Sequence, residues 1–309
     1  MEKTIKRNRI KGDRSVASAI YKIVFLILLC VYALSIIATF LFAFMTSFKT
    51  GDAYNLNLLG LPFGKDFTVK NYVDVFTVFR AKVTRGGVSG YVGITDMLIS
   101  SLVYSVGGAL LASIACCVTA YAVSRFNNWM SGVIYSIVII TMALPIVGSL
   151  PSELQVLLML NLYNKRIGLL FLSSSFLGMH FLVFHASFKS IPKDFAEAAK
   201  IDGAGEWRIF LTIMFPLVKL AFFTIFLLKF MVFWNNYETP MIHTPDYPVL
   251  ALGVFRINHG ENVVTGDLKV TTMPHKLASS MIVLVPVLIL FLFTHKRLIG
   301  NVSMGGVKG

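Results

Sequence analysis

The chain consists of long apolar runs separated by shorter polar segments. A helix that crosses a bilayer needs about 20 mostly apolar residues, and six runs reach that length. We therefore predict transmembrane helices over residues 20–46, 98–122, 131–150, 167–188, 213–236 and 277–295. Pro145 and Pro151 predict that the outer end of the third helix is bent or broken. Small residues in the second helix, such as Gly107 and Gly108, predict close helix packing.

Composition supports this pattern and excludes other classes. Of the 309 residues, 56% are hydrophobic and 14% are charged, whereas about a quarter are charged in a soluble domain. No water-soluble fold of this size hides so much apolar surface, and intrinsic disorder needs the opposite composition. The sequence thus predicts an all-α integral membrane protein. The first apolar run is too long for a signal-peptide core, so we expect it to be retained.

Charge predicts the orientation. The formal net charge is +13. Lys and Arg are about twice as dense in segments 1–22, 123–130, 189–210 and 296–309 as in segments 47–97, 151–166 and 237–276, which lie on the other side of the predicted helices. Because such residues favour the cytoplasmic side, we expect both termini to be cytoplasmic. The basic N-terminal tail is interpreted as a topology signal that contacts anionic membrane lipid, not as a nucleic-acid-binding arm.

These helices and charges predict one membrane unit with short extensions. The expected parts are a cytoplasmic basic tail (1–19), the first transmembrane helix (20–46), an extracytoplasmic loop (47–97), a five-helix core (94–297) and a cytoplasmic tail (298–309). The loop contains several turn-forming residues, which indicate a small cap or a helix leading into the second span.

The sequence holds no constellation typical of an enzyme. Cys30, Cys116 and Cys117 lie in apolar runs and form no C-x-x-C pair. His180 and His185 are five residues apart, so they do not share a helix face, and packing is their expected role. The string from Gly60 to Lys65 has the wrong spacing for a phosphate-binding loop. We expect a non-enzymatic chain with no cofactor, metal or ATPase site of its own.

One predicted cytoplasmic segment differs from a featureless loop. Pro192 ends the incoming helix, and Asp194 with Glu197 three residues later predicts a capped helix over 195–201. Asp202-Gly203 predicts a turn, and a second short helix follows from Ala204. Small residues beside apolar ones suit a rigid docking element for a cytoplasmic partner. An ordinary amphipathic interfacial loop is the alternative, and the residues alone leave both open.

The same segment resembles the EAA motif of ABC importer permeases. The match consists of Glu197-Ala198-Ala199, Asp202-Gly203-Ala204, and then Ile213 and Pro216. Phe215 stands where that family usually has Leu, and Leu220 stands where a second proline is common; both remain apolar. The resemblance implies a type I ABC importer permease fold of six transmembrane helices, in which segment 194–208 forms the cytoplasmic coupling helix.

The resemblance also implies partners and a location. Glu197, Ala198, Ala199, Asp202, Gly203 and Ala204 would dock an ATP-binding cassette subunit dimer, which holds the ATP and Mg²⁺. A homologous second permease subunit would complete a heterodimer, and an extracytoplasmic solute-binding protein would deliver the solute. The implied location is the bacterial cytoplasmic membrane.

Further matches extend the resemblance over nearly the whole chain. They include Ser47-Phe48-Lys49, Phe67-Thr68-Val69-Lys70-Asn71-Tyr72, Ala120-Tyr121-Ala122 with Arg125, and Phe188-Lys189-Ser190-Ile191-Pro192. Trp234-Asn235 and the glycine-rich 305–309 are similar to the maltose-permease inner-subunit type, which serves sugars and oligosaccharides. These matches imply alternating-access import of a sugar or oligosaccharide.

The fifth predicted helix offers a candidate solute path. One broad face carries Phe222, Phe226, Lys229, Phe233 and Asn236. Aromatic rings with an amide and an ammonium suit a sugar, and an intramembrane charge is usually buried against protein or water. A helix–helix interface in which Lys229 is paired or snorkels is the alternative.

Two other functions stay open beside sugar import. One is an ABC importer permease for a non-sugar solute. The other is an ion-coupled secondary transporter, which expects internal repeats and intramembrane carboxylates. The sequence shows no clear repeat, and no Asp or Glu lies centrally in a predicted span.

Overall fold

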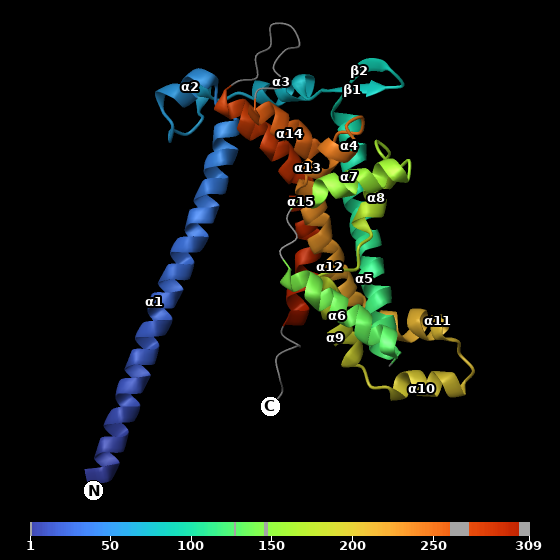
Figure 1. Ribbon diagram of the computed structural model, residues 1–309. Helices are drawn as coiled ribbons and strands as arrows, with labels where there is room; N and C mark the ends of the chain where they lie inside the picture. Colours follow the sequence, from blue (N-terminus) through green and yellow to red (C-terminus); the bar gives the residue numbers. More distant parts are fainter. Residues whose placement is uncertain (1, 127, 145–147, 260–271, 303–309) are drawn as a thin grey trace. The chain divides into compact units, whose positions relative to one another are not determined.

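The computed structural model describes residues 2–126, 128–144, 148–259 and 272–302. Pro145 and the glycine-rich motif 305–309 lie outside the described residues. The described part is mostly helical (Figure 1). It divides into two compact units: residues 1–75 with 271–281, and residues 76–270 with 282–309.

The first unit begins with one long helix, α1 (Glu2–Ser47), whose candidate membrane span is Ser18–Ser47. It continues through α2 (Gly51–Leu56), the 3₁₀ turn η1 (Gly64–Asp66) and the start of α3 (Lys70–Val78). None of the apolar window of α1 is buried within the chain. Such a surface needs lipid or another helix against it.

A buried polar cluster folds the chain that follows α1. The Asn71 side chain donates to the carbonyl oxygens of Ser47 (2.8 Å) and Lys49 (2.7 Å). The Lys49 ammonium, 2% exposed, donates to the carbonyls of Asn57 and Leu58 at 3.1 and 2.9 Å. Burial raises the pKa of Tyr72, so its hydroxyl stays protonated and hydrogen-bonded to Ser47 at 2.7 Å. These bonds join the Ser47-Phe48-Lys49 motif to the motif that begins at Phe67, so the two form one structural unit.

The second unit begins with a hairpin of β1 (Ala81–Arg85) and β2 (Val88–Val92), paired antiparallel with Arg85 opposite Val88. Gly86 and Gly87 have φ of +58° and +82°, as a two-residue hairpin turn requires. The sequence predicted turns in this loop but not the strands.

Helices make up the rest of the second unit. In chain order these are α4 (Ile94–Leu102), the π-helical η2 (Val103–Gly107), α5 (Gly108–Arg125), α6 (Trp129–Ala143), α7 (Ser149–Met159), α8 (Arg166–Ser173), α9 (Met179–Lys189), α10 (Asp194–Ile201), α11 (Glu206–Ile209), the π-helical η3 (Phe210–Met214), α12 (Phe215–Asn235), α13 (Glu238–His243) and α14 (Leu250–His259). The last helix, α15 (Met273–Val302), contains Pro286.

Four helical stretches among the described residues are long and apolar enough to cross a membrane. They are Ser18–Ser47, Ile94–Arg125, Glu206–Asn235 and Met273–Thr294. They coincide with four of the six predicted spans. The third predicted span is represented by α6, which ends at Ala143, so the expected break near the prolines is confirmed.

The prediction of one continuous helix over 167–188 is wrong. The chain leaves helical geometry between α8 and α9, where Gly178 has φ +108°. The Ser174 hydroxyl donates to the Phe171 carbonyl, and the Ser175 hydroxyl accepts from the Leu177 amide. Such local bonds compete with the helical ladder, and hydropathy alone does not register them.

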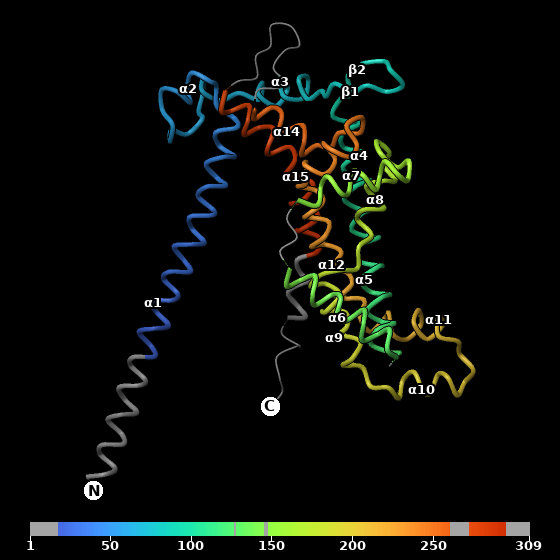
Figure 2. Tube along the Cα trace, in the orientation of Figure 1, coloured from blue at the N-terminus to red at the C-terminus, as the bar shows by residue number. Residues whose placement is uncertain are grey.

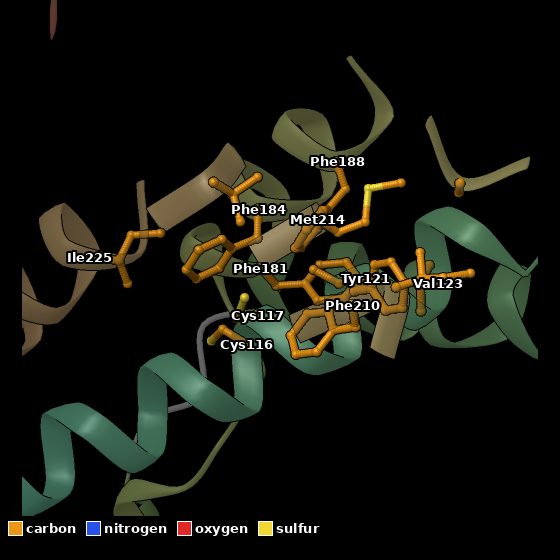
Figure 3. Close-up of a cluster of buried hydrophobic side chains, with 14 of the residues drawn as sticks. Cys116, Cys117, Tyr121, Val123, Phe181, Phe184, Phe188, Phe210, Met214 and Ile225 are labelled. Carbon is orange, nitrogen blue, oxygen red and sulfur yellow. The ribbon is translucent and has the colours of Figure 1, made fainter. Parts of the chain in front are cut away.

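The core of the second unit lies where α5, α9 and α12 pack together. One face of α5 is fully buried and built of small residues, namely Ala109, Ala112, Cys116 and Ala120. Large rings from α9 fill the space beside it, including Phe181 and Phe184 (Figure 3). Small residues let the helices approach closely. At Gly107, an added Cβ would lie 2.8 Å from Leu170, so the predicted close packing of this helix is confirmed.

Candidate functional site

Helices α10 and α11 form a helix–turn–helix beyond the ends of α5 and α9, and the chain reverses between them (Figures 1 and 2). Gly203 has φ +78°. Its amide donates to the Lys200 carbonyl at 3.0 Å, and the Ala204 amide donates to the Ala199 carbonyl at 2.9 Å. This pair of bonds is a Schellman motif, which needs a left-handed residue at this position. The predicted helix and turn are confirmed, and the motif explains the glycine.

The start of α10 differs from the prediction. Asp194 is the first helical residue and not the cap; Lys193 holds the cap position without a side-chain bond to the helix. The predicted capping box with Glu197 is therefore wrong. Asp194 and Glu197 instead lie in the first helical turn, where a carboxylate interacts favourably with the partial positive charge of the helix N-terminus.

The two faces of the segment differ in character. Ala196 and Ala199 are buried on α10, and Ile209 is buried at the end of α11. The opposite side exposes large apolar side chains, with Ile201 88% and Trp207 67% exposed. Apolar groups this exposed are favourably covered by a partner protein or by lipid. Of the six predicted coupling residues, Ala199 is buried, Ala204 is half-buried and the others are exposed.

A polar link ties the segment to the core. Glu206 of α11 forms an ion pair with Lys200 of α10 across the turn. The Tyr121 hydroxyl at the end of α5 donates to the same carboxylate at 3.4 Å. The Tyr121 ring packs against Phe188 of α9 and Phe210 of η3, with centroids 5.4 and 4.8 Å apart. These contacts join α5, α9 and the turn into one body.

Sequence reasoning missed this role of Lys200, Glu206 and Tyr121. The one sequence signal for Tyr121 was its place in the Ala120-Tyr121-Ala122 match to the resembling family. Nothing in the local pattern placed it beside Glu206, 85 residues away.

The predicted solute-path residues lie along α12 and directly after its end, and all of them are half-buried. Phe222 packs against Phe184 and Phe215, with centroids 6.2 and 5.2 Å away. Phe233 lies 5.2 Å from the Tyr104 ring. Phe226 stacks at 6.4 Å on Phe223 of its own helix.

The two polar members of this set have different surroundings. The Lys229 ammonium lies within electrostatic range of His180 and Cys116, and no carboxylate pairs with it among the described residues. Asn236 follows the end of α12 and bonds Thr239 through both its side-chain nitrogen (3.0 Å) and its side-chain oxygen (3.1 Å). Asn236 thereby fixes the start of α13.

A second polar cluster holds the hairpin to the loop after α13. Asp246 is 8% exposed and accepts from the Thr84 amide at 2.7 Å and from the Asn164 side chain at 2.6 Å. Arg85 donates to the Asp246 carbonyl at 2.9 Å, and its guanidinium lies over the Tyr247 ring. This structural role of Asp246 was not predicted from the sequence.

Together these features define a polytopic helical membrane protein whose core carries a rigid, partly apolar helix–turn–helix at one end. The family model described as "Binding-protein-dependent transport system inner membrane component" matches residues 108–295, more than half of the chain. The chain therefore belongs to this family of membrane transport components, and the resemblance seen in the EAA-like residues is confirmed.

Characterised relatives align over most of the chain. The melibiose/raffinose/stachyose import permease protein MelC of Bacillus subtilis (strain 168) is 27% identical over 217 residues, which are 69% of this chain and 76% of MelC. The diacetylchitobiose uptake system permease protein NgcG of Streptomyces coelicolor is 25% identical over 283 residues, 90% of this chain and 86% of NgcG.

A solved structure supports the fold. A chain from the crystal structure of a bacterial ABC transporter involved in the import of the acidic polysaccharide alginate superposes with a TM-score of 0.71. It is 23% identical, and the match covers 91% of this chain and 97% of that one. The fold is thus that of an ABC importer permease.

Proposed function

We propose that the chain is the permease subunit of an ATP-driven, binding-protein-dependent importer of a sugar or oligosaccharide. The observation that carries this proposal is the family membership, joined to the α10–α11 segment at the position of the EAA-like residues. The relatives named above import melibiose, raffinose and stachyose, or diacetylchitobiose, by their names. A carbohydrate is therefore the favoured solute class over a non-sugar solute.

In this proposal, α10 and α11 couple the permease to a partner ATPase. Glu197, Ala198, Asp202 and Gly203 lie on the exposed part of the segment, and Ala199 and Ala204 support it from behind. Closure of the ATPase pulls on the exposed face. Because the Schellman turn and the Tyr121–Glu206 bond make the segment rigid, the displacement reaches α5 and rocks it with α9.

Six membrane passes follow from the same proposal. The four long helices supply four of them, α6 supplies the third pass in chain order, and α8 with α9 supplies the fourth as a broken helix. The 15 residues of α6 rise about 22 Å, less than the roughly 30 Å hydrocarbon core. A broken helix is tolerated inside a membrane where its freed carbonyls are bonded. The Cys116 thiol donates to the carbonyls of Ser175 and Phe176 at this break, at 3.7 and 3.6 Å.

We propose the domain boundaries and orientation that the sequence predicts: cytoplasmic tails at 1–19 and 298–309, an outer segment at 47–97 and a core over 94–297. The chain supplies one coupling segment, and an ATPase dimer has two docking clefts. A second, homologous permease subunit would supply the other. ATP and Mg²⁺ bind the ATPase subunits, and an extracytoplasmic binding protein delivers the solute.

For the solute path we propose Phe222, Phe226, Lys229, Phe233 and Asn236. Half-buried rings along one helix offer faces for sugar C–H groups, and Lys229, which pairs with no carboxylate among the described residues, offers hydrogen-bond donors. The Phe222 contacts with Phe184 and Phe215 limit its role to the wall of the path.

Reconstitution tests the proposal. Proteoliposomes would contain this chain, its partner permease and the ATPase subunit, with the binding protein outside. We expect accumulation of radiolabelled raffinose or diacetylchitobiose that requires ATP inside and no ion gradient. Accumulation driven by an ion gradient without ATP would contradict the proposal. Uptake of an amino acid but of no sugar would contradict the solute class.

A further inference from the structure

A cavity of about 370 Å³ lies at the ends of α5 and α9, beside the α10–α11 segment. Its size falls within the range of small-ligand sites. Apolar lining comes from Val123, Phe188 and Met214, which gather in Figure 3. The solute path and the coupling surface described above leave this cavity without a role.

The charged lining of the cavity is entirely basic. It includes Arg125 at the end of α5, Lys189 at the end of α9 and Lys193 before α10, and no carboxylate. Within the described residues, none of these three side chains forms an ion pair or a hydrogen bond. The nearby Glu206 is engaged by Lys200 and Tyr121.

These three cations line one cavity whose lining contains no carboxylate, and an anion bound between them lowers their mutual repulsion. Arg and Lys are the usual donors to phosphate oxygens. The Ser124 hydroxyl also lines the cavity and can donate to the same group. The chemistry therefore suits an oxyanion such as a phosphate group.

We infer that this cavity binds the phosphate headgroup of an anionic phospholipid. Free phosphate and nucleotides share the phosphate chemistry, but the apolar side chains in the lining suit the glycerol and upper acyl chain of a lipid. The cavity also lies where two apolar helices end, which is the depth of headgroups in a bilayer. Only the choice of the cytoplasmic leaflet rests on the proposed function.

Binding of defined lipids to the purified full-length chain in a zwitterionic detergent tests the inference. Native mass spectrometry would count bound phosphatidylglycerol and compare it with phosphatidylcholine of the same chain length. Inorganic phosphate and ATP serve as soluble competitors. The test variant is Lys189→Gln with Lys193→Gln. The charge-preserving control is Lys189→Arg with Lys193→Arg, and the position control is Arg208→Gln, an exposed cation on α11 outside the cavity.

We expect tight binding of one phosphatidylglycerol in preference to phosphatidylcholine. Each lost cation weakens such binding about fivefold, so the double Gln variant should bind roughly 25-fold more weakly. Both controls should bind as the unaltered chain does. Unchanged lipid preference in the double Gln variant would overturn the inference. So would inorganic phosphate or ATP binding as tightly as the lipid.

A partner protein offers a different explanation of the basic cavity. Loss of ATPase-subunit assembly in the double Gln variant, with lipid binding unaltered, would assign the cavity to an acidic segment of that subunit and overturn the lipid inference. Because lipid binding is measured on the purified chain without the ATPase subunit and without transport, its failure is distinguishable from failure of the transport proposal.

Discussion

The hydroxyl of Tyr121, at the end of α5, donates a hydrogen bond to the Glu206 carboxylate on α11 over 3.4 Å. This bond joins the packed core of the membrane unit to the helix–turn–helix at its end. Glu206 also pairs with Lys200 across the turn. One carboxylate therefore contacts both α10 and α5 from its position on α11. In the proposed mechanism, this carboxylate transmits movement of the segment to α5.

Replacement of Tyr121 by Phe tests this link. The ring still packs against Phe188 and Phe210, but the hydrogen bond is lost, which removes about 1 kcal/mol. We expect normal membrane insertion and roughly fivefold weaker stimulation of the partner ATPase by the loaded binding protein. Equal stimulation in the two proteins would show that the bond carries no coupling. Tyr91→Phe, which removes the hydroxyl of an exposed tyrosine on β2, is the matched control.

The exposed apolar side chains of the segment give a second prediction. Trp207→Ser should weaken affinity for the ATP-binding subunit by roughly 30-fold or more, since aromatic anchors dominate interfaces. Because Trp207 is 67% exposed, stability of the free chain should change little. Leu59, 78% exposed on the outer segment, provides the control Leu59→Ser. Cross-linking from Ile201→Cys in a Cys30→Ser background measures the same contact, since the remaining cysteines are buried.

Lys229 tests the solute path. Lys229→Gln should raise the KM for sugar uptake several-fold and leave basal ATP hydrolysis unchanged, because an ammonium donor to the sugar is lost. Lys219→Gln, an exposed cation on the same helix, should leave KM unaltered. A fall in the amount of folded protein, with KM unchanged, would instead place Lys229 in helix packing.

Asn71 carries a prediction on stability. Its amide satisfies two backbone carbonyls, and the side chain is 4% exposed. Asn71→Ala should lower the free energy of unfolding by about 2 kcal/mol, since it leaves buried acceptors without donors. The exposed Asn55→Ala should be neutral. The midpoint of thermal unfolding in detergent distinguishes the two variants, and equal midpoints would contradict the assigned role.

Local signals allowed much of the segment to be predicted from sequence. Alanines before Asp202-Gly203 specify a helix and its end, because glycine adopts φ +78° at little cost. The predicted cap at Asp194 failed because several residues near a helix start can take that position, and tertiary packing decides which does.

Features that depend on tertiary packing could not be predicted from local sequence patterns. The break between α8 and α9 lies in an apolar stretch, where serine hydroxyls and a thiol replace helical bonds that hydropathy does not report. Likewise, the Tyr121–Glu206 contact depends on how α5 meets α11, which no local pattern contains. The candidate solute path was placed on one helix by periodicity, but the role of Asn236 before α13 depends on a turn that periodicity does not predict.

The Gly203→Val and Gly205→Val variants test the coupling role of the segment most directly, through ATP-driven sugar uptake in reconstituted vesicles. No atom lies within 4 Å of an added Cβ at either glycine, so bulk alone is tolerated at both. Gly203 has φ +78°, which strains a β-branched residue, whereas Gly205 has φ −72°. We expect Gly203→Val to abolish ATPase association and uptake with insertion intact, Gly203→Asn to restore part of both, and Gly205→Val to transport normally. Undiminished uptake by Gly203→Val, independent of ATP, would contradict the account.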